Sequence, residues 1–372
     1  MSAGSSFSEF DRRAMSRALA LAEHGMETTH PNPRVGCVIA RGDRMISEGF
    51  HERAGGPHAE VVALRALAAG ESAEGATVYV TLEPCSHHGR TPPCVDALID
   101  ARVGRVVFAI EDPNPEVAGR GAEALERAGM QVESGLMTAE AEELNAGYLM
   151  LRRSGRPFVR LKVGMSLDGR TALKNGASKW ITGEAARNDV QHWRARSSAV
   201  LTGIGTVLAD DPALNVRLPG ASRQPMRVVL DTNLRMPPTA RMFEGDPKPL
   251  IFTASSDSAR IAALAQRGAQ IEHIETTAND SGAGYLRSVL ARLAELSVSE
   301  VLVEAGPTLA GTFVQYGMVD ELLLYMAPRL LGPQARGLFD LPPLDDLQQA
   351  QQFGIIEQLM VGDDLRLRLR PA

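Results

Sequence analysis

The stretch EPCSHHGRTPPC, residues 83–94, decides how we interpret the first half of the chain. It contains Cys85 and Cys94, two of the three cysteines, with two histidines and an arginine between them. The stretch is too polar and too rich in proline for a strand or a helix, so we expect a loop. Thiols and imidazoles are the side chains that bind zinc, and two thiols in a loop need a third protein ligand from elsewhere in the chain.

The best candidate for that ligand lies in residues 57–60, PHAE. We expect His58 at the start of a helix and Glu60 two positions later, so that their side chains point roughly 200° apart around the axis. They would then not bind one metal together, and His58 suits a ligand while Glu60 suits a proton carrier. Three protein ligands leave one tetrahedral position for water, whose pKa zinc lowers from about 15.7 to about 7.

An H-x-E motif followed by P-C…C is the signature of zinc-dependent nucleobase deaminases, although eight residues separate the cysteines here instead of two. The H-x-E motif alone carries little weight, because Glu is common in the first turn of a helix. Two cysteines with nearby histidines also fit a closed structural Cys₂His₂ site. The order strand, H-x-E helix, strand, P-C loop and helix favours the catalytic interpretation. Cys37, in the apolar run VGCVIA, is expected to pack in the core.

Length and composition narrow the class of protein. A chain of 372 residues exceeds most single domains, and the pattern of elements restarts near MLRRSGRPFV, so we expect domains at residues 1–153 and 154–372. The net charge of −6 and 5% aromatic residues argue against a nucleic-acid partner. We find no membrane-spanning run and no secretory signal, and therefore expect a cytoplasmic protein with reduced cysteines. We also expect a homo-oligomer, a dimer in particular.

Strands alternate with helices in both halves, which predicts two α/β domains. In the first half we expect strands at 35–40, 75–84, 104–114 and 130–135, and helices at 9–25, 58–70, 94–102 and 119–129. In the second half we expect strands at 158–165, 198–205, 226–232, 249–255, 269–275, 299–306, 320–328 and 363–371. The helices expected there cover residues 183–197, 257–268, 284–296 and 308–317.

The second half has no complete dinucleotide-binding fingerprint, because GIGTVL (203–208) has Leu208 where a third glycine would stand. The segment VLVEAGPTLAG (301–311) is a strand that ends at Glu304 and is followed by a helix with Pro307 in its first turn. Such a turn can bind the diphosphate of a cofactor, or it can be an ordinary strand–helix connection. Lys162 alternates with two apolar neighbours on its strand and is either a cleft residue or a solvated one.

Several segments together resemble one family. THPNPRVGCVIA, GPHAEVVAL, VTLEPCSHHGRTPPCVDALI and DPNPEVAGRG, with LKVGMSLDGRTA, SKWITG, LTGIGTVLADDPALNVR and VEAGPTLAG, are similar to the bifunctional riboflavin-biosynthesis deaminase–reductase (RibD) family. The resemblance covers nearly the whole chain, and it includes the long loop between the cysteines. It implies an N-terminal cytidine-deaminase-like α/β/α domain and a C-terminal α/β domain similar to dihydrofolate reductase.

The resemblance also implies two reactions. The first would deaminate 2,5-diamino-6-(5-phosphoribosylamino)pyrimidin-4-one to 5-amino-6-(5-phosphoribosylamino)uracil, with one zinc ion bound by His58, Cys85 and Cys94 and with Glu60 as proton carrier. The residues that would contact this substrate are Asn32, His51, His87, Arg90, Asp112 and Asn114. A nucleic-acid-editing deaminase and a zinc-structured binding module are the competing classes.

The second reaction would reduce the ribosyl group to ribityl with NADPH. The resemblance implies that Lys162 and Asp210 act near the reacting carbon. The cofactor would be lined by Gly164, Trp180, Thr206, Asp210, Thr232, Gly306, Pro307, Thr308, Leu309, Ala310, Gly311 and Thr312. The substrate would be contacted by Ser178, Arg194, Leu214, Arg217 and Glu304.

Overall fold

A computed structural model describes residues 7–87, 92–114, 118–275 and 282–372. The chain divides into two compact units, Met1–Gly155 and Arg156–Ala372, which we call the N-terminal and C-terminal units. The division falls two residues after the position expected from the sequence, because a helix continues to Ser154 before the chain turns at Gly155.

The N-terminal unit has a five-stranded sheet of order β2-β1-β3-β4-β5. Its strands are β1 (Gly36–Arg41), β2 (Arg44–Phe50), β3 (Thr77–Val80), β4 (Arg105–Phe108) and β5 (Gln131–Ser134). Its helices are α1 (Glu9–Glu23), α2 (Ala59–Arg65), α3 (Cys94–Asp100), α4 (Arg120–Arg127), α5 (Thr138–Leu144) and α6 (Ala146–Ser154). Strands β3, β4 and β5 are parallel, whereas β1 is antiparallel to both of its neighbours.

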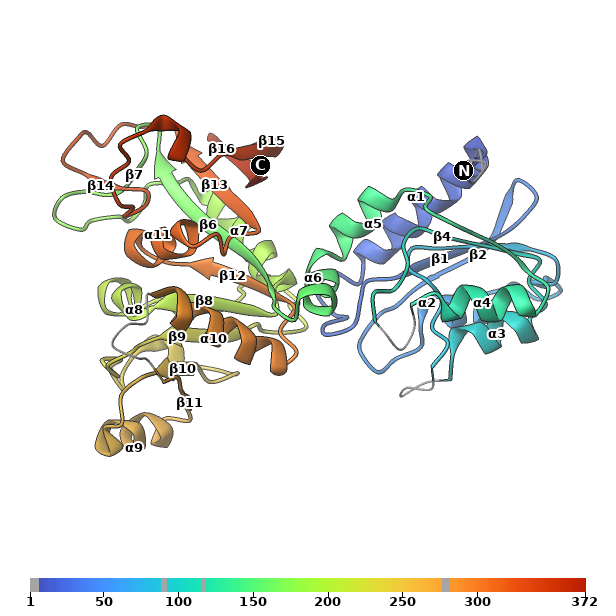
Figure 1. Ribbon diagram of the computed structural model, residues 1–372, viewed down its shortest axis with the longest axis horizontal. Coiled ribbons are helices and arrows are strands. Elements are labelled where there is room, and N and C mark those ends of the chain that lie inside the picture. Colours follow the sequence, from blue (N-terminus) through green and yellow to red (C-terminus); the bar gives the residue numbers. More distant parts are fainter. Residues whose placement is uncertain (1–6, 88–91, 115–117, 276–281) are drawn as a thin grey trace. The chain divides into compact units, whose positions relative to one another are not determined.

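Helices cover both faces of this sheet (Figure 1). Side chains of α1, α5 and α6 pack on one face around Val38 and Val107, and side chains of α2, α3 and α4 pack on the other around Cys37 and Val106. Adjacent residues of a strand point to opposite faces, which explains why Cys37 and Val38 belong to different cores. The expected α/β/α architecture is confirmed, and Cys37 is fully buried as expected.

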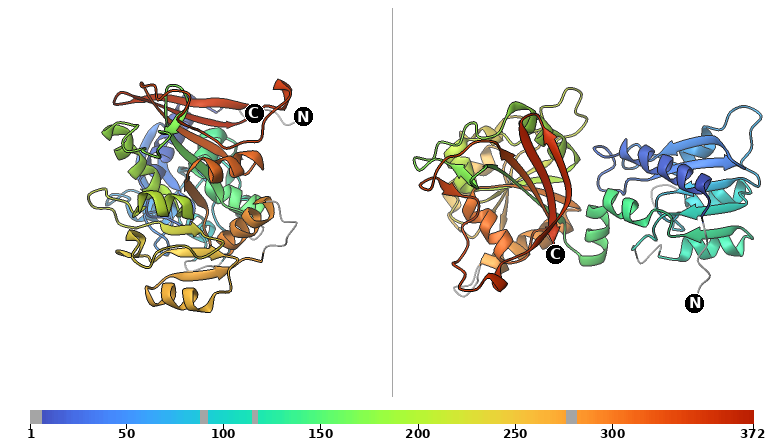
Figure 2. Two further views of the ribbon diagram at one scale, coloured as in Figure 1. Left: turned by 90° about the vertical axis from the view of Figure 1, so that its left-hand side faces the viewer. Right: turned by 90° about the horizontal axis from the view of Figure 1, so that it is seen from above.

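The C-terminal unit has a nine-stranded sheet of order β11-β10-β9-β8-β12-β6-β13-β16-β15. The strands are β6 (Phe158–Ser166), β8 (Ala199–Gly203), β9 (Met226–Leu230), β10 (Leu250–Thr253), β11 (Gln270–His273), β12 (Glu300–Glu304), β13 (Glu321–Ala327), β15 (Phe353–Val361) and β16 (Asp364–Pro371). A small separate pair is formed by β7 (Arg170–Ala172) and β14 (Arg336–Gly337). The last two strands, red in Figure 1 and Figure 2, continue the parallel part of the sheet in antiparallel fashion.

The helices of this unit also lie on both faces of its sheet. They are α7 (Glu184–Arg196), α8 (Ile204–Asp210), α9 (Ser258–Gln266), α10 (Gly282–Glu295) and α11 (Pro307–Gln315), with short 3₁₀ turns η1 (Arg241–Phe243) and η2 (Leu347–Gln349). Side chains of α10 and α11 form one core with the sheet, and those of α7, α8 and α9 form the other. The expected α/β class is therefore confirmed for this unit as well.

A buried ion network ties the middle of this sheet together. Arg160 on β6 is 1% exposed and donates to Glu321 on β13 (2.6 Å) and to Glu300 on β12 (3.1 Å). Because β6 lies between β12 and β13, the guanidinium of Arg160 reaches a carboxylate on each neighbouring strand. The network fixes the neighbours of the strand that also carries Lys162.

Several elements were not expected from the sequence: β2, β15, α5, α6 and α8, together with the short pair of β7 and β14 and the 3₁₀ turns η1 and η2. The strand expected at 198–205 ends at Gly203, and Ile204 already begins α8. Strands β2 and β15 lie at the edges of their sheets, where one side of the strand has no partner strand.

Candidate functional sites

The three expected zinc ligands come together in the N-terminal unit. The Nδ1 atom of His58 lies 3.1 Å from Sγ of Cys94 and 3.5 Å from Sγ of Cys85, and the three ligand atoms all lie within 4.8 Å of one another. In a tetrahedral site with ordinary Zn–S and Zn–N bond lengths, ligand atoms stand about 3.5 Å apart. The donor set and its spacing therefore fit one zinc ion.

Local structure explains how these ligands meet. His58 is the N-cap residue of α2 and has an extended backbone, so it stands just before the helix instead of within its first turn. Cys94 is the first residue of α3, and Cys85 follows β3 in the loop that leads to this helix. The backbone N–H of Cys94 donates to Sγ of Cys85 (3.3 Å), which draws the two ends of the loop together.

Glu60 lies beside these ligands and is 3% exposed. Burial, and then the nearby Cys85, raise the pKa of Glu60 to about 7, which suits a group that both takes up and gives off protons. Hydrogen bonding from Cys94, supported by His58, lowers the pKa of Cys85 to about 4. Cys85 is therefore favoured as a thiolate, the form in which cysteine binds a metal.

His51 and Asn32, both expected to contact the first substrate, lie next to this centre. His51 donates from Nδ1 to the carbonyl of Pro57 (2.9 Å), so its Nε2 accepts from the amide of Asn32 (3.1 Å). The ring of His51 lies edge-to-face with that of His58, with centroids 5.4 Å apart. The Nδ1 atom of His87 is buried and has no hydrogen-bond partner among the described residues. Arg90 lies outside the described residues.

Asp112 and Asn114 form a second wall near the end of β4. The Asp112 carboxylate accepts from the hydroxyl of Tyr148 (2.8 Å) and from the backbone N–H of Asn114 (2.9 Å). Burial raises the pKa of Asp112. Sequence reasoning missed Tyr148, because a tyrosine 36 positions away carries no local signal for such a contact.

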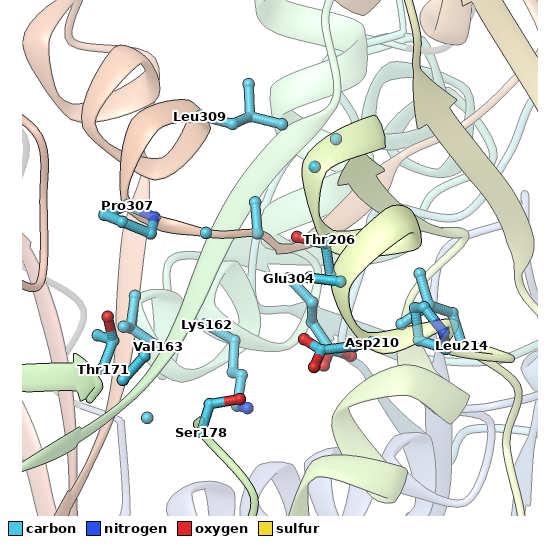
Figure 3. A pocket seen from close by; sticks show the side chains of 18 of the residues that line it. Lys162, Val163, Thr171, Ser178, Thr206, Asp210, Leu214, Glu304, Pro307 and Leu309 are labelled. Atoms are coloured by element: carbon cyan, nitrogen blue, oxygen red, sulfur yellow. The ribbon is translucent and has the colours of Figure 1, made fainter. Parts of the chain in front are cut away.

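A second site lies in the C-terminal unit, in a cavity of about 940 Å³ (Figure 3). This volume is typical of pockets that bind small molecules and cofactors. Eight Lys or Arg side chains and two carboxylates belong to the described residues that line it. The lining is therefore strongly basic in a chain whose net charge is −6, which favours anionic ligands.

Lys162 and Glu304 form the centre of this cavity. Lys162 on β6 is in register with Glu304 on β12, so both side chains project from the same face of neighbouring strands. Arg194 holds the Glu304 carboxylate through two hydrogen bonds, from Nε (2.6 Å) and from Nη2 (3.0 Å). Burial lowers the pKa of Lys162. The attraction of Glu304 opposes this shift, and repulsion from Arg194 adds to it.

The pKa of Glu304 is also lowered, but here burial opposes the shift. Burial alone would raise its pKa, but the ion pair with Arg194, together with Lys162 and Arg217, lowers it. Arg194 and Arg217 were both expected to contact the substrate. Arg194 forms an ion pair with Glu304, whereas the exposed Arg217 forms no ion pair with a described residue. Figure 3 shows Asp210 near Glu304 and Ser178 near Lys162.

Ten of the twelve residues expected around the cofactor line this cavity: Gly164, Trp180, Thr206, Asp210, Thr232, Gly306, Pro307, Thr308, Leu309 and Thr312. Gly306 is the N-cap of α11 and Pro307 its first residue, so free backbone N–H groups face the cavity. Ala310 and Gly311 do not line it. Ala310 is fully buried in the core, and a Cβ on Gly311 would stand 2.4 Å from the Asp340 carbonyl oxygen. All five residues expected around the substrate line the cavity: Ser178, Arg194, Leu214, Arg217 and Glu304.

Comparison with known proteins agrees with both sites. The model of the cytidine and deoxycytidylate deaminase zinc-binding region matches residues 8–110, and that of the RibD C-terminal domain matches residues 157–361. The riboflavin biosynthesis protein RibD of Escherichia coli (strain K12) is 49% identical, over 96% of this chain and 99% of that protein. The chain belongs to the RibD family.

Solved structures from the RibD family extend the agreement to three dimensions. Form 1 of Acinetobacter baumannii RibD has a TM-score of 0.90 at 46% identity, over 98% of this chain and 99% of that one. A Thermotoga maritima diaminohydroxyphosphoribosylaminopyrimidine deaminase/5-amino-6-(5-phosphoribosylamino)uracil reductase has a TM-score of 0.85 at 33% identity, with the same coverage. The chain is accordingly an enzyme of riboflavin biosynthesis with deaminase and reductase activities, and its cofactors are zinc and NADPH. None of the helices in the described part of the chain is long and apolar enough to cross a membrane.

The donor set leads to a first prediction. The purified protein should contain one zinc ion per chain, and Cys94→Ala should lose it because two remaining ligands hold the metal poorly. Cys37→Ala, which changes a buried core thiol in β1, should keep it. Elemental analysis of protein prepared without chelator measures the content. Zinc-free wild-type protein, or a Cys94→Ala variant with full zinc, would refute the assignment.

Proposed function

We propose that the N-terminal unit deaminates 2,5-diamino-6-(5-phosphoribosylamino)pyrimidin-4-one, and that the C-terminal unit reduces the ribosyl group of the resulting uracil to ribityl. The similar Thermotoga maritima protein, a diaminohydroxyphosphoribosylaminopyrimidine deaminase/5-amino-6-(5-phosphoribosylamino)uracil reductase, combines these two activities. A deaminase family model matches residues 8–110, and the model of the RibD C-terminal domain matches residues 157–361. These matches support the assignment of one reaction to each unit.

The convergence of His58, Cys85 and Cys94 beside the buried Glu60 is the observation that carries the deaminase assignment. These three residues hold the zinc ion, which, when bound, lowers the pKa of water to about 7. Deamination replaces an exocyclic amino group by oxygen from water and releases ammonia. Glu60 takes one proton from water and gives it to the ring nitrogen, then takes the second proton from the hydroxyl group that has been added to the ring carbon and passes it to the departing amine.

The walls of the first site orient the pyrimidine. His51, fixed by Pro57, presents Nε2 toward Asn32, and this pair offers donors and acceptors to the edge of the base. The Nδ1 atom of His87 is buried and has no partner among the described residues, which supports a contact to substrate, because buried polar atoms are rarely left without a partner. Asp112 and Asn114 contact the substrate from the other wall, and Arg90 belongs to the same proposal.

A second prediction concerns Glu60. Glu60→Gln should keep its zinc but lose deamination by about 10²–10⁴-fold, because Gln has nearly the same shape and cannot carry a proton. The rate of ammonia release measures the loss. Reduction of the already deaminated substrate by the same preparation is the control and should be unchanged. A variant that retains most of its deaminase rate would show that another group carries the proton.

The pairing of Lys162 with Glu304 inside a basic cavity is the observation that carries the reductase assignment. NADPH, when bound, supplies the hydride, so the protein has to position the sugar and stabilise its developing charge. Lys162 donates to the oxygen of the opening sugar ring. Asp210 orients the nicotinamide, and the start of α11 binds the cofactor diphosphate.

The remaining residues of the cavity hold the substrate. Arg217 binds its phosphate, since Arg194 is engaged in the two hydrogen bonds to Glu304. Glu304, held in place by Arg194, accepts from the hydroxyl groups of the sugar. Ser178 and Leu214 complete the contacts.

A third prediction tests the independence of the two sites. Lys162→Ala, and separately Asp210→Asn, should each slow reduction by about 10²–10³-fold, because each removes a preorganised polar group from the reacting centre. Ammonia release should stay near the wild-type rate, because the two sites share no residue. The assay follows NADPH oxidation and ammonia separately, each on its own substrate.

The matched control is Lys174→Ala, which removes an exposed lysine of the same unit that does not line the cavity. It should leave both rates unchanged. Loss of ammonia release in a folded, zinc-loaded Lys162→Ala protein would mean that the two reactions depend on one composite site.

Two further properties belong to this proposal. The chain acts in the cytoplasm, which its three unbonded cysteines support, since a reducing compartment keeps thiols free. It also forms a homodimer through β15, the edge strand of the nine-stranded sheet. This strand exposes Ile355, Ile356, Leu359 and Met360, at 46–60% of their surface. An exposed apolar edge strand is a template for pairing with a second chain.

A fourth prediction tests this interface. Leu359→Asp, which places a charge on the exposed edge, should convert the dimer to a monomer, as measured by sedimentation. Leu208→Asp is the control, because Leu208 is similarly exposed on α8, away from the edge strand. A wild-type protein that sediments as a monomer, or a Leu359→Asp protein that remains a dimer, would contradict the proposed interface.

A further inference from the structure

Glu83 lies two positions before the zinc ligand Cys85 and is 3% exposed. Its carboxylate accepts from four backbone N–H groups of one later segment. Oε1 accepts from Gly121 (3.0 Å) and Ala122 (3.2 Å), and Oε2 accepts from Gly119 (3.1 Å) and Asp112 (3.3 Å). A buried carboxylate with this set of donors is well satisfied without a cation.

The helix end explains part of this arrangement. The N-cap of α4 is Gly119, which has no side chain to accept from the first free N–H groups of the helix. Glu83 performs this task from a different segment, and its negative charge suits the positive end of the helix. The contact is tight, because a Cβ on Gly121 would stand 2.1 Å from the carbonyl oxygen of Pro84.

Glu83 also contacts the wall of the first site that Asp112 and Asn114 form. The backbone of Asp112 donates to Glu83, while the Asp112 side chain accepts from Tyr148 and from the N–H of Asn114. A single carboxylate thus connects the loop that carries Cys85 with the segment that carries Asp112 and Asn114. None of the four donors to Glu83 belongs to a zinc ligand. Capping of α4 alone would not require the hydrogen bond from the backbone of Asp112.

We propose that Glu83 is a positioning residue for deamination, which holds Asp112 and Asn114 at a fixed place relative to the zinc ligands. This inference rests on the proposed function, because it takes Asp112 and Asn114 as substrate contacts. Glu83 itself does not touch the substrate. Its carboxylate fixes the place of the wall that binds the pyrimidine, and displacing this wall weakens binding of the ground state and the transition state alike, which raises KM more than it lowers kcat.

The test is Glu83→Gln in the full-length, zinc-loaded protein. Gln has nearly the same shape, but its NH₂ group replaces one of the two acceptor oxygens and faces two N–H donors. We expect the KM for the diaminopyrimidine to rise roughly tenfold or more, with a smaller change in kcat, full zinc content and an unchanged reductase rate. The reductase rate of the same chain reports that the preparation is folded.

Gly121→Ala provides a second variant in case Glu83→Gln folds poorly. Its added methyl group would press against the Pro84 carbonyl and displace α4 without changing any charge. It should raise the same KM. Glu126→Gln is the matched control, because Glu126 lies exposed on the same helix and should leave KM unchanged.

The outcomes separate this inference from the proposed function. A folded, zinc-loaded Glu83→Gln protein with a KM within twofold of wild type would overturn the positioning role alone. Loss of zinc from that variant would also overturn it, because the carboxylate would then serve the ligands and not the substrate wall. If the wild-type chain released no ammonia from this pyrimidine, the proposed function would fail and the inference with it.

Discussion

Parallel strands end at the same edge of their sheet, and both sites of this chain lie at such an edge. In the N-terminal unit, β3 is paired in parallel with β4, so the loop with Cys85 and the segment with Asp112 start side by side. In the C-terminal unit, β6, β8, β9 and β12 run in parallel, and the residues that follow them line one cavity. Strand pairing thus brings together side chains that are far apart in the sequence, and the chemistry of both sites depends on it.

The parts of the sites that could be predicted carry their signal locally. The spacing of His58, Glu60, Cys85 and Cys94 reflects what a zinc ion with an open position requires, and the family resemblance supplied their expected roles. Strands that are buried on both faces, such as β4 and β12, were predicted because apolar β-branched residues follow one another there. The edge strands β2 and β15 were missed. Polar residues interrupt β2, and no residue of β15 is buried, so neither segment shows the regular alternation of a half-buried strand.

The parts that could not be predicted depend on long-range pairing. Arg194 and Glu304 are 110 positions apart, and only the fold shows that this guanidinium binds this carboxylate. The contact of Glu83 with Gly121 spans 38 positions, and the sequence likewise carries no local signal for it. The run from Gly306 to Thr312 was expected to line the cofactor as a block. Because it forms a helix, two of its residues turn toward the core.

Crystallographic analysis of the full chain with NADPH, using anomalous scattering at the zinc edge, tests the central claim most directly. The claim is that two separate sites, one in each unit, carry the two reactions. It predicts a single anomalous peak among His58, Cys85 and Cys94, and a nicotinamide ring beside Lys162 in the C-terminal cavity. A zinc peak at any other place, or NADPH bound at the cysteine ligands, would contradict it.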